Sequence, residues 1–131
     1  AAPDEQQALG LEEALDVHVY EGLSLADGHP VALFRSVFPA ARLPHVLKDL
    51  RDTGSVTEAL RRGGVEDYTR ASTRLTAKLA SATQALHLRV KEGAPILRSI
   101  AVNVDASGAP VEYGHTWFAG DRVTLTVNDL A

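Results

Sequence analysis

The chain has 131 residues, of which 45% are hydrophobic, and this is typical of one globular domain with its own core. Its formal net charge is −4 and its 13 lysines and arginines are scattered, so it lacks the basic stripe of a protein that contacts DNA directly. The absence of cysteine excludes disulfides, thiolate zinc sites and a cysteine nucleophile, and it fits a cytoplasmic protein.

No apolar run is long enough to span a membrane and no signal-peptide core is present, so we expect no membrane partner. The chain begins with Ala1-Ala2-Pro3 and contains no methionine. We therefore expect a processed protein or a piece of a longer one. A cleaved signal peptide would leave a similar start.

The first half of the chain predicts a short helix, a strand hairpin and two further helices. An Asp-Gly pair at residues 27–28 is typical of a tight hairpin turn. Ser55-Val56-Thr57-Glu58 has the spacing of a capping box, and Gly63-Gly64 can end the helix that follows. The expected elements are a helix over residues 4–10 capped by Asp4, strands over 16–24 and 31–38, helical apolar spacing from 43 to 50, and a short helix after Ser55.

The second half predicts four strands and one helix. A long alternation over residues 65–79 places apolar side chains on one face and Arg70, Ser72 and Arg74 together on the other. Ser81 and Gln84 form a second capping box, and strands are expected over 96–104, 111–118 and 122–127. Short strands joined by hairpins make a largely antiparallel sheet with helices packed against it, so the fold class is α+β.

The familiar catalytic signatures are missing. The five histidines show no His-x-x-x-His or His-Glu-x-x-His spacing, so a zinc site is not expected. No Gly-rich phosphate loop precedes a helix, and no Gly-x-Ser-x-Gly elbow occurs. We predict no metal, no cofactor and no enzymatic activity.

Two arginines form the first candidate binding site. Arg70 and Arg74, with Ser72 between them, could clamp a phosphate or phosphonate, because guanidinium groups offer paired donors to such oxyanions. A solvated strand face explains the same pattern without a ligand.

Two further features are candidates. Glu112, Thr116 and Phe118 alternate along one expected strand, and a carboxylate beside an aromatic ring suits a small molecule with hydroxyl or amine groups. Ser55 lies at a helix start, where anions can bind. An edge charge beside a core ring, and plain helix capping, explain these features without a ligand.

Several short motifs occur in the order and spacing of one protein family. They are Asp27-Gly28-His29-Pro30-Val31-Ala32-Leu33, Ser55-Val56, Tyr68-Thr69-Arg70-Ala71-Ser72-Thr73-Arg74-Leu75-Thr76-Ala77, Glu92-Gly93-Ala94-Pro95-Ile96-Leu97, Gly108-Ala109-Pro110-Val111-Glu112-Tyr113 and Gly120-Asp121-Arg122. Together they resemble the UTRA domain of HutC-type GntR transcriptional regulators, over essentially all 131 residues. Residues 73–77 are most similar to the branch that regulates phosphonate-uptake and C–P lyase operons.

The resemblance implies a chorismate-lyase-like fold, a central antiparallel sheet flanked by helices, in one domain over residues 1–131. It implies the sensing half of a cytoplasmic repressor that binds a small-molecule effector and forms a homodimer. DNA would be bound only through an N-terminal winged helix-turn-helix domain that this chain lacks. In sugar-phosphate-sensing relatives, Glu112 and Phe118 sit where ligand-contacting residues lie, and Ser55 lies near a phosphate-binding helix start.

The phosphate-binding arginines of those relatives fall near Gly22 and Ser24, neither of which is basic. A phosphosugar is therefore not expected, and we expect Arg70 and Arg74 to bind a small anionic effector of the phosphonate or phosphate type.

Two other functions stay open from the sequence. The implied fold is shared with chorismate lyase, so a lyase acting on a small aromatic carboxylate is one alternative, although it rests on fold analogy. The other is a dimerisation module whose pocket has closed. Turnover of chorismate would indicate the first, and a structure without a cavity would favour the second.

Overall fold

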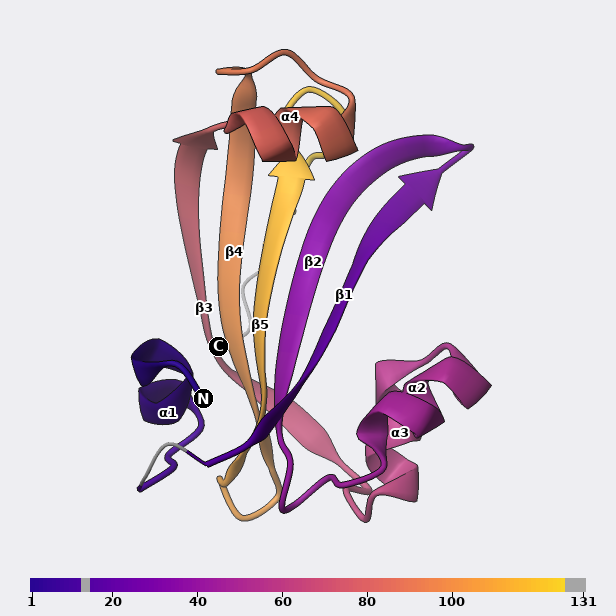
Figure 1. The fold of residues 1–131 in the computed structure, drawn as a ribbon, viewed down its shortest axis with the longest axis vertical. Coiled ribbons are helices and arrows are strands. Elements are labelled where there is room, and N and C mark those ends of the chain that lie inside the picture. Colours follow the sequence, from indigo (N-terminus) through magenta and orange to yellow (C-terminus); the bar gives the residue numbers. More distant parts are fainter. Residues whose placement is uncertain (13–14, 127–131) are drawn as a thin grey trace.

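The computed structural model describes residues 1–12 and 15–126. The described chain forms a single antiparallel sheet with strand order β1-β2-β5-β4-β3 and four short helices around it (Figure 1). The elements are α1 (Pro3–Ala8), β1 (Val17–Ala26), β2 (His29–Pro39), α2 (Val46–Thr53), α3 (Val56–Arg62), β3 (Tyr68–Leu79), α4 (Ala82–Leu88), β4 (Pro95–Asp105) and β5 (Pro110–Ala119). The predicted α+β class and the antiparallel sheet flanked by helices are confirmed.

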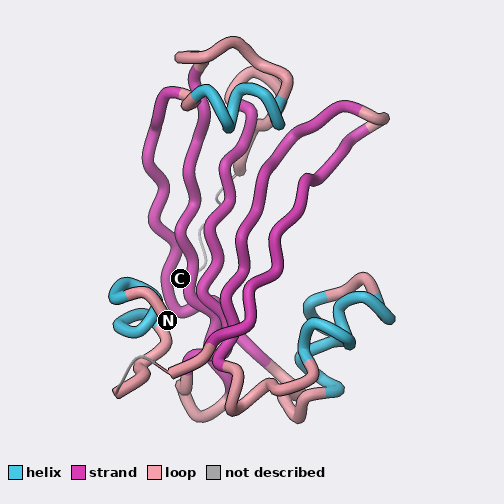
Figure 2. Tube along the Cα trace, viewed as in Figure 1, coloured by secondary structure: helices cyan, strands magenta, loops and turns pink. Residues whose placement is uncertain are grey.

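The helices gather at the two ends of the sheet. Figure 2 shows α4 at one end and the other three helices near the opposite end. No helix in the described ranges is long and apolar enough to cross a membrane.

The two faces of the sheet carry different cores. The face to which Thr116 and Phe118 of β5 point, here the front face, packs against α2 and α3 through a cluster built around Phe38, Leu50 and Leu60. The face to which Tyr113 and Trp117 point, here the back face, packs against α1 at one end and α4 at the other. Between these two helices the back face is only partly covered.

The predicted hairpin turn is confirmed. Asp27 and Gly28 have φ angles of 50° and 77°, so both are left-handed, as a two-residue turn between twisted strands requires. The helix predicted over residues 4–10 spans Pro3–Ala8 and is capped by Ala2, so Asp4 lies in its first turn rather than at its cap.

The capping box predicted at Ser55 is only half formed. Ser55 Oγ accepts a hydrogen bond from the Glu58 backbone N–H at 3.2 Å, but the Ser55 N–H donates to Thr53 Oγ1 instead of to Glu58. The Glu58 carboxylate pairs with Arg61. The box at Ser81 and Gln84 is complete.

The strand predicted over residues 122–127 is wrong for the part that is described, because residues 123–126 form no strand and Arg122 lies in a turn. Residue 127 lies outside the described residues. Both edges of β5 are already paired, with β2 and with β4, so the segment that leaves β5 finds no free neighbour there.

Candidate functional site

A cleft opens on the front face, between the sheet and the α2–α3 helix pair. Its volume is about 490 Å³, which is within the range of small-molecule sites in proteins. Three aromatic rings, three hydroxyl side chains and several small or aliphatic residues line it: Tyr20, Ser24, Val31, Ala32, Phe34, Ser36, Leu50, Gly54, Val56, Thr116, Phe118 and Val123. None of these residues carries a formal charge.

A glycine on β1 shapes the wall of this cleft. A Cβ placed on Gly22 would come within 2.5 Å of the Phe34 ring, so glycine is what allows the ring to lie across β1. The Tyr20 and Phe34 ring centroids are 5.5 Å apart in a tilted arrangement. The cleft therefore presents aromatic edges and faces to a ligand, which favours a molecule with an apolar or planar part.

A buried carboxylate lies further along the same face. Glu112 Oε1 accepts a hydrogen bond of 2.8 Å from Asn103, whose side-chain oxygen accepts one of 2.8 Å from Arg70 Nε. A Cβ on Gly114 would lie 3.9 Å from Ser36 Oγ and 4.0 Å from Glu112 Oε2, so these two oxygens converge over Gly114. Ser36 lines the cleft, so this pair can receive hydroxyl or ammonium groups of a ligand.

The structure brings four of the five predicted site residues to the front face. Phe118 lines the cleft, and Ser55 lies between Gly54 and Val56, which also line it. Glu112 and Arg70 are joined through Asn103 across the same face. The hydroxyl of Ser55 caps α3. Whether any of these residues binds an effector stays a prediction.

The expectation that Arg70, Ser72 and Arg74 share one face is wrong. The register of β3 against β4 shifts between Arg70 and Ser72, because Ala71 is an extra residue in a β-bulge. Arg70 lies opposite Asn103, whereas Ser72 lies opposite Val102, the adjacent β4 residue, whose side chain points to the other face. The bulge leaves Arg70 on the front face and sends Ser72 and Arg74 to the back.

Arg74 lines a separate cleft on the back face. This cleft has a volume of about 370 Å³ and lies between α1 and strands β3, β4 and β5. Further along the same face, burial lowers the pKa of His115 from its ordinary value, which favours the neutral imidazole. The His115 ring stacks on Trp117 with centroids 5.6 Å apart.

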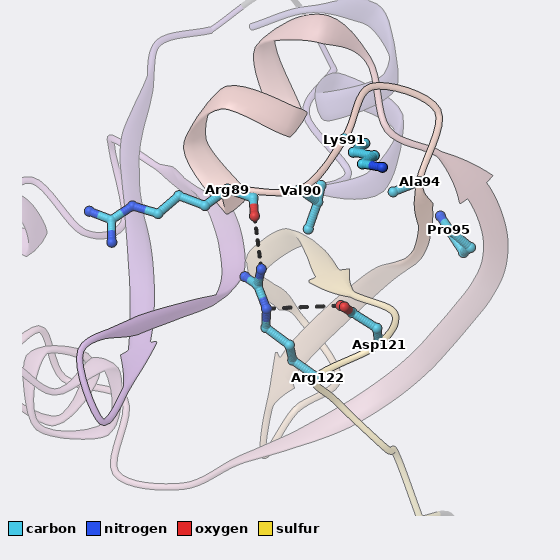
Figure 3. Close-up of a pocket in the computed structure, with 7 residues that line it drawn as sticks. All are labelled: Arg89, Val90, Lys91, Ala94, Pro95, Asp121 and Arg122. Carbon is cyan, nitrogen blue, oxygen red and sulfur yellow. Dashed lines mark hydrogen bonds and ion pairs between the residues drawn. The ribbon is translucent and has the colours of Figure 1, made fainter.

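A third cleft surrounds Arg122 near the end of α4 (Figure 3). The Arg122 guanidinium donates to the backbone oxygens of Leu88, Arg89 and Pro30. Figure 3 shows the Arg89 side chain pointing away from Arg122, so only its carbonyl takes part. This guanidinium is already occupied by backbone acceptors, which indicates a structural role.

Sequence reasoning missed the aromatic side chains of the hairpin, Tyr20 and Phe34, and the hydroxyl of Ser36. They lie on expected strands, but nothing in their local spacing distinguishes a cleft wall from a core. No cluster of His, Asp and Glu that could hold a metal ion is found within residues 1–12 and 15–126.

The chain matches the UTRA domain family over residues 1–124. It is 36% identical over 120 residues to an uncharacterized HTH-type transcriptional regulator, RB1450, of Rhizobium meliloti (strain 1021). This alignment covers 92% of the present chain and 49% of that protein, so the chain spans about half the length of this relative.

Solved structures show the same fold. PhnF from Mycobacterium smegmatis is 26% identical with a TM-score of 0.86, and the match covers 100% of this chain and 58% of that one. A GntR-family regulator from Enterococcus faecalis V583 is 23% identical with a TM-score of 0.83, covering 98% and 92% of the two chains. The ligand-binding domain of a putative GntR-family regulator from Bordetella bronchiseptica is 20% identical with a TM-score of 0.86, covering 98% and 84%.

Proposed function

Because this chain belongs to the UTRA domain family of GntR-type transcriptional regulators, we propose that it binds a small-molecule effector in the front-face cleft and thereby controls DNA binding by a separate winged-helix domain. UTRA domains belong to regulators, which are not enzymes, so the family argues against a chorismate-lyase-like activity. The observation that carries the proposal is the cleft itself. It combines three aromatic rings, the hydroxyls of two serines and a threonine and, beside it, the buried Glu112.

The effector presents a hydroxyl or amine group to Glu112 and Ser36. Among the described residues, Asn103 donates one hydrogen bond to the Glu112 carboxylate, which can accept more and would repel an anionic group placed beside it. The phosphate or phosphonate group expected from the sequence would then lie away from Glu112, where the uncharged lining offers it neutral donors such as the Ser24 hydroxyl. The sequence similarity to the phosphonate branch supports this effector class, as does the similarity to the protein named PhnF.

Thermal unfolding with matched ligands tests this effector class. We expect 2-aminoethylphosphonate, which carries both an amine and a phosphonate, to stabilise the chain, whereas methylphosphonate at the same concentration gives a smaller shift. A ligand at 100 times its Kd stabilises by about 2.7 kcal/mol, enough to raise the midpoint by several degrees. Phe118→Ala should remove the additional shift that 2-aminoethylphosphonate gives over methylphosphonate, and Glu112→Gln should remove the preference for the amine. Equal shifts with both compounds would contradict the role of Glu112.

The regulator acts as a homodimer, and the edge strand β3 supports this part of the proposal. All but its first residue are exposed, and β4 pairs with only one of its two edges. Leu75 and Leu79 are 44% and 72% exposed on it. A long edge with unpaired backbone N–H and C=O groups is what proteins normally shield, so pairing of two β3 strands into one continuous sheet is favoured.

A charge on this edge should separate the protomers. We expect Leu75→Asp to weaken the dimer by about tenfold or more, because two like charges would face each other near the twofold axis. Light scattering coupled to size-exclusion chromatography gives the mass. The matched control is Leu86→Asp on α4, where the leucine is 75% exposed. A dimer that survives in Leu75→Asp and dissociates in Leu86→Asp would place the interface on α4.

Such a regulator has one conformation that binds DNA and another that does not. An effector shifts the equilibrium between them only by the difference in its affinity for the two. Coupling of about 1–3 kcal/mol would change DNA affinity by roughly 5- to 150-fold. Because this coupling is reciprocal, operator DNA would change effector affinity in the whole regulator by the same factor.

A further inference from the structure

The back face holds two arginines that form no ion pair within residues 1–12 and 15–126. Three arginines lie on this face, and Arg35 is paired with Glu5 at 2.6 Å and with Glu21 at 3.7 Å. Arg74 and Arg98 form no ion pair and no side-chain hydrogen bond within residues 1–12 and 15–126, and the Arg98 Nε is buried without a partner. In the described part of the chain these two guanidinium groups therefore lack the direct carboxylate contact that Arg35 has.

The register places the two unpaired arginines close together. Arg74 lies opposite Ile100 and Thr76 lies opposite Arg98, so Arg74 and Arg98 are diagonal neighbours on one face of an antiparallel pair. Diagonal neighbours are within reach of long side chains, and like charges at such positions repel each other. An oxyanion between them would relieve this repulsion and accept hydrogen bonds from both guanidinium groups.

A preformed hollow lies beside Arg74 on this face, and Arg98 lies just beyond the residues that line it. The cleft of about 370 Å³ is lined by Arg74, Ser72 and the Tyr113 side chain from the sheet, with Asp4 and Gln7 of α1 opposite. Ile100, next to Arg98 along the same face, also lines it. The Tyr113 hydroxyl donates to Asp4 at 3.4 Å, so Asp4 is the acidic group that an entering anion would meet.

We propose that the end of this back-face cleft beside Ile100 is a second binding site, separate from the effector cleft, where a small phosphate or phosphonate oxyanion lies between Arg74 and Arg98. Ser72 adds a hydroxyl donor, and Asp4 limits the affinity by repulsion. The two clefts lie on opposite faces of the sheet, so occupancy of one does not block the other. The site does not depend on the nature of the effector proposed for the front face.

Calorimetric titration with inorganic phosphate tests the site, with methylphosphonate and acetate as comparison ligands at constant ionic strength. We expect phosphate and methylphosphonate to bind and acetate to bind more weakly, because it offers fewer oxygens and less charge. Arg74→Ala and Arg98→Ala should each weaken phosphate binding by about tenfold, the effect of losing a pair of charge-assisted hydrogen bonds. Lys78→Ala, which removes another exposed cation from the same strand, serves as the matched control and should leave the Kd unchanged.

A substitution that strengthens phosphate binding, rather than weakening it, distinguishes a ligand site from a purely structural role. Asp4→Asn removes the opposing charge but keeps a hydrogen-bond acceptor for Tyr113, so phosphate should bind about two- to fivefold more tightly. Phe118→Ala in the front cleft should leave phosphate binding unchanged. Phosphate binding that is lost in Phe118→Ala and retained in Arg74→Ala would place the anion in the front cleft and overturn the proposal. An absence of phosphate binding at millimolar concentration would overturn it as well.

Discussion

Replacing Arg122 by alanine is expected to lower the free energy of unfolding by about 2–3 kcal/mol, because one charged side chain bonds to three backbone oxygens. Two of these oxygens belong to Leu88 and Arg89, at the end of α4, where helical carbonyls lack partners and attract positive charge. The third belongs to Pro30 of β2. Arg122 therefore fastens the segment after β5 to two other parts of the chain.

A close backbone contact explains why a glycine stands two residues before this arginine. A Cβ on Gly120 would lie 2.6 Å from the Pro95 carbonyl oxygen, which accepts a hydrogen bond from the Gly120 N–H at 3.1 Å. Only glycine allows the chain to pass so close to the start of β4 and then turn Arg122 toward α4. The Gly120-Asp121-Arg122 motif thus holds the segment after β5 against the start of β4 and the end of α4.

Chemical denaturation measures the loss in Arg122→Ala. We expect Arg122→Lys to be intermediate, because an ammonium group can reach one carbonyl but cannot bridge all three. Lys91→Ala, which truncates an exposed cation beside the same helix end, should stay within about 0.5 kcal/mol of the parent protein. Equal stabilities for Arg122→Ala and Lys91→Ala would show that the carbonyl bonds contribute nothing net.

The sequence predicted the strands well where turn chemistry and alternation agreed. The Asp-Gly turn fixed the first hairpin, and β4 and β5 lie within about a residue or two of their predicted ranges. The prediction of a strand after β5 failed, because an alternating pattern does not reveal whether a neighbouring strand edge is available for pairing. Arg122 bonds to carbonyls instead of continuing a ladder.

The bulge at Ala71 could not be predicted from the pattern. Residues on both sides of it are polar and exposed, so no apolar side chain signals the change of face. In a buried strand, a shift of one residue would bring polar side chains into the core and would be visible in the sequence. On an edge strand exposed on both faces this constraint is absent, so the sequence pattern predicts Arg70 and Arg74 on one face although they lie on opposite faces.

The front-face cleft was predicted only in part for a different reason. Phe118 and Glu112 belong to one strand, so their alternation placed them together. The other walls come from β1, β2 and the α2–α3 pair, and their meeting depends on strand order rather than on local spacing. The ring of Phe34 over Gly22 is such a tertiary contact.

Truncation of the front-face core is expected to have the largest effect on stability. Phe38 is 0% exposed and packs in the cluster that holds α2 and α3 against the sheet. Phe38→Ala should cost about 3–5 kcal/mol, because it removes a buried ring and leaves a cavity. For a domain of this size the unfolding midpoint would fall by about 10 °C or more.

The adjacent residue provides the matched control, because strand alternation points it to the other face. Val37 is also 0% exposed, but it packs with Leu9 and Tyr113 under α1. Hydrogen exchange should separate the two variants: Phe38→Ala should speed exchange in α2 and α3, and Val37→Ala in α1. Since Leu50 of α2 forms part of the cleft wall, loosening this helix pair would also weaken ligand binding in the front cleft. Faster exchange in α1 after Phe38→Ala would mean that the two faces of the sheet unfold as one cooperative unit. The α2–α3 pair would then have no separate local stability on which ligand binding in the front cleft could depend.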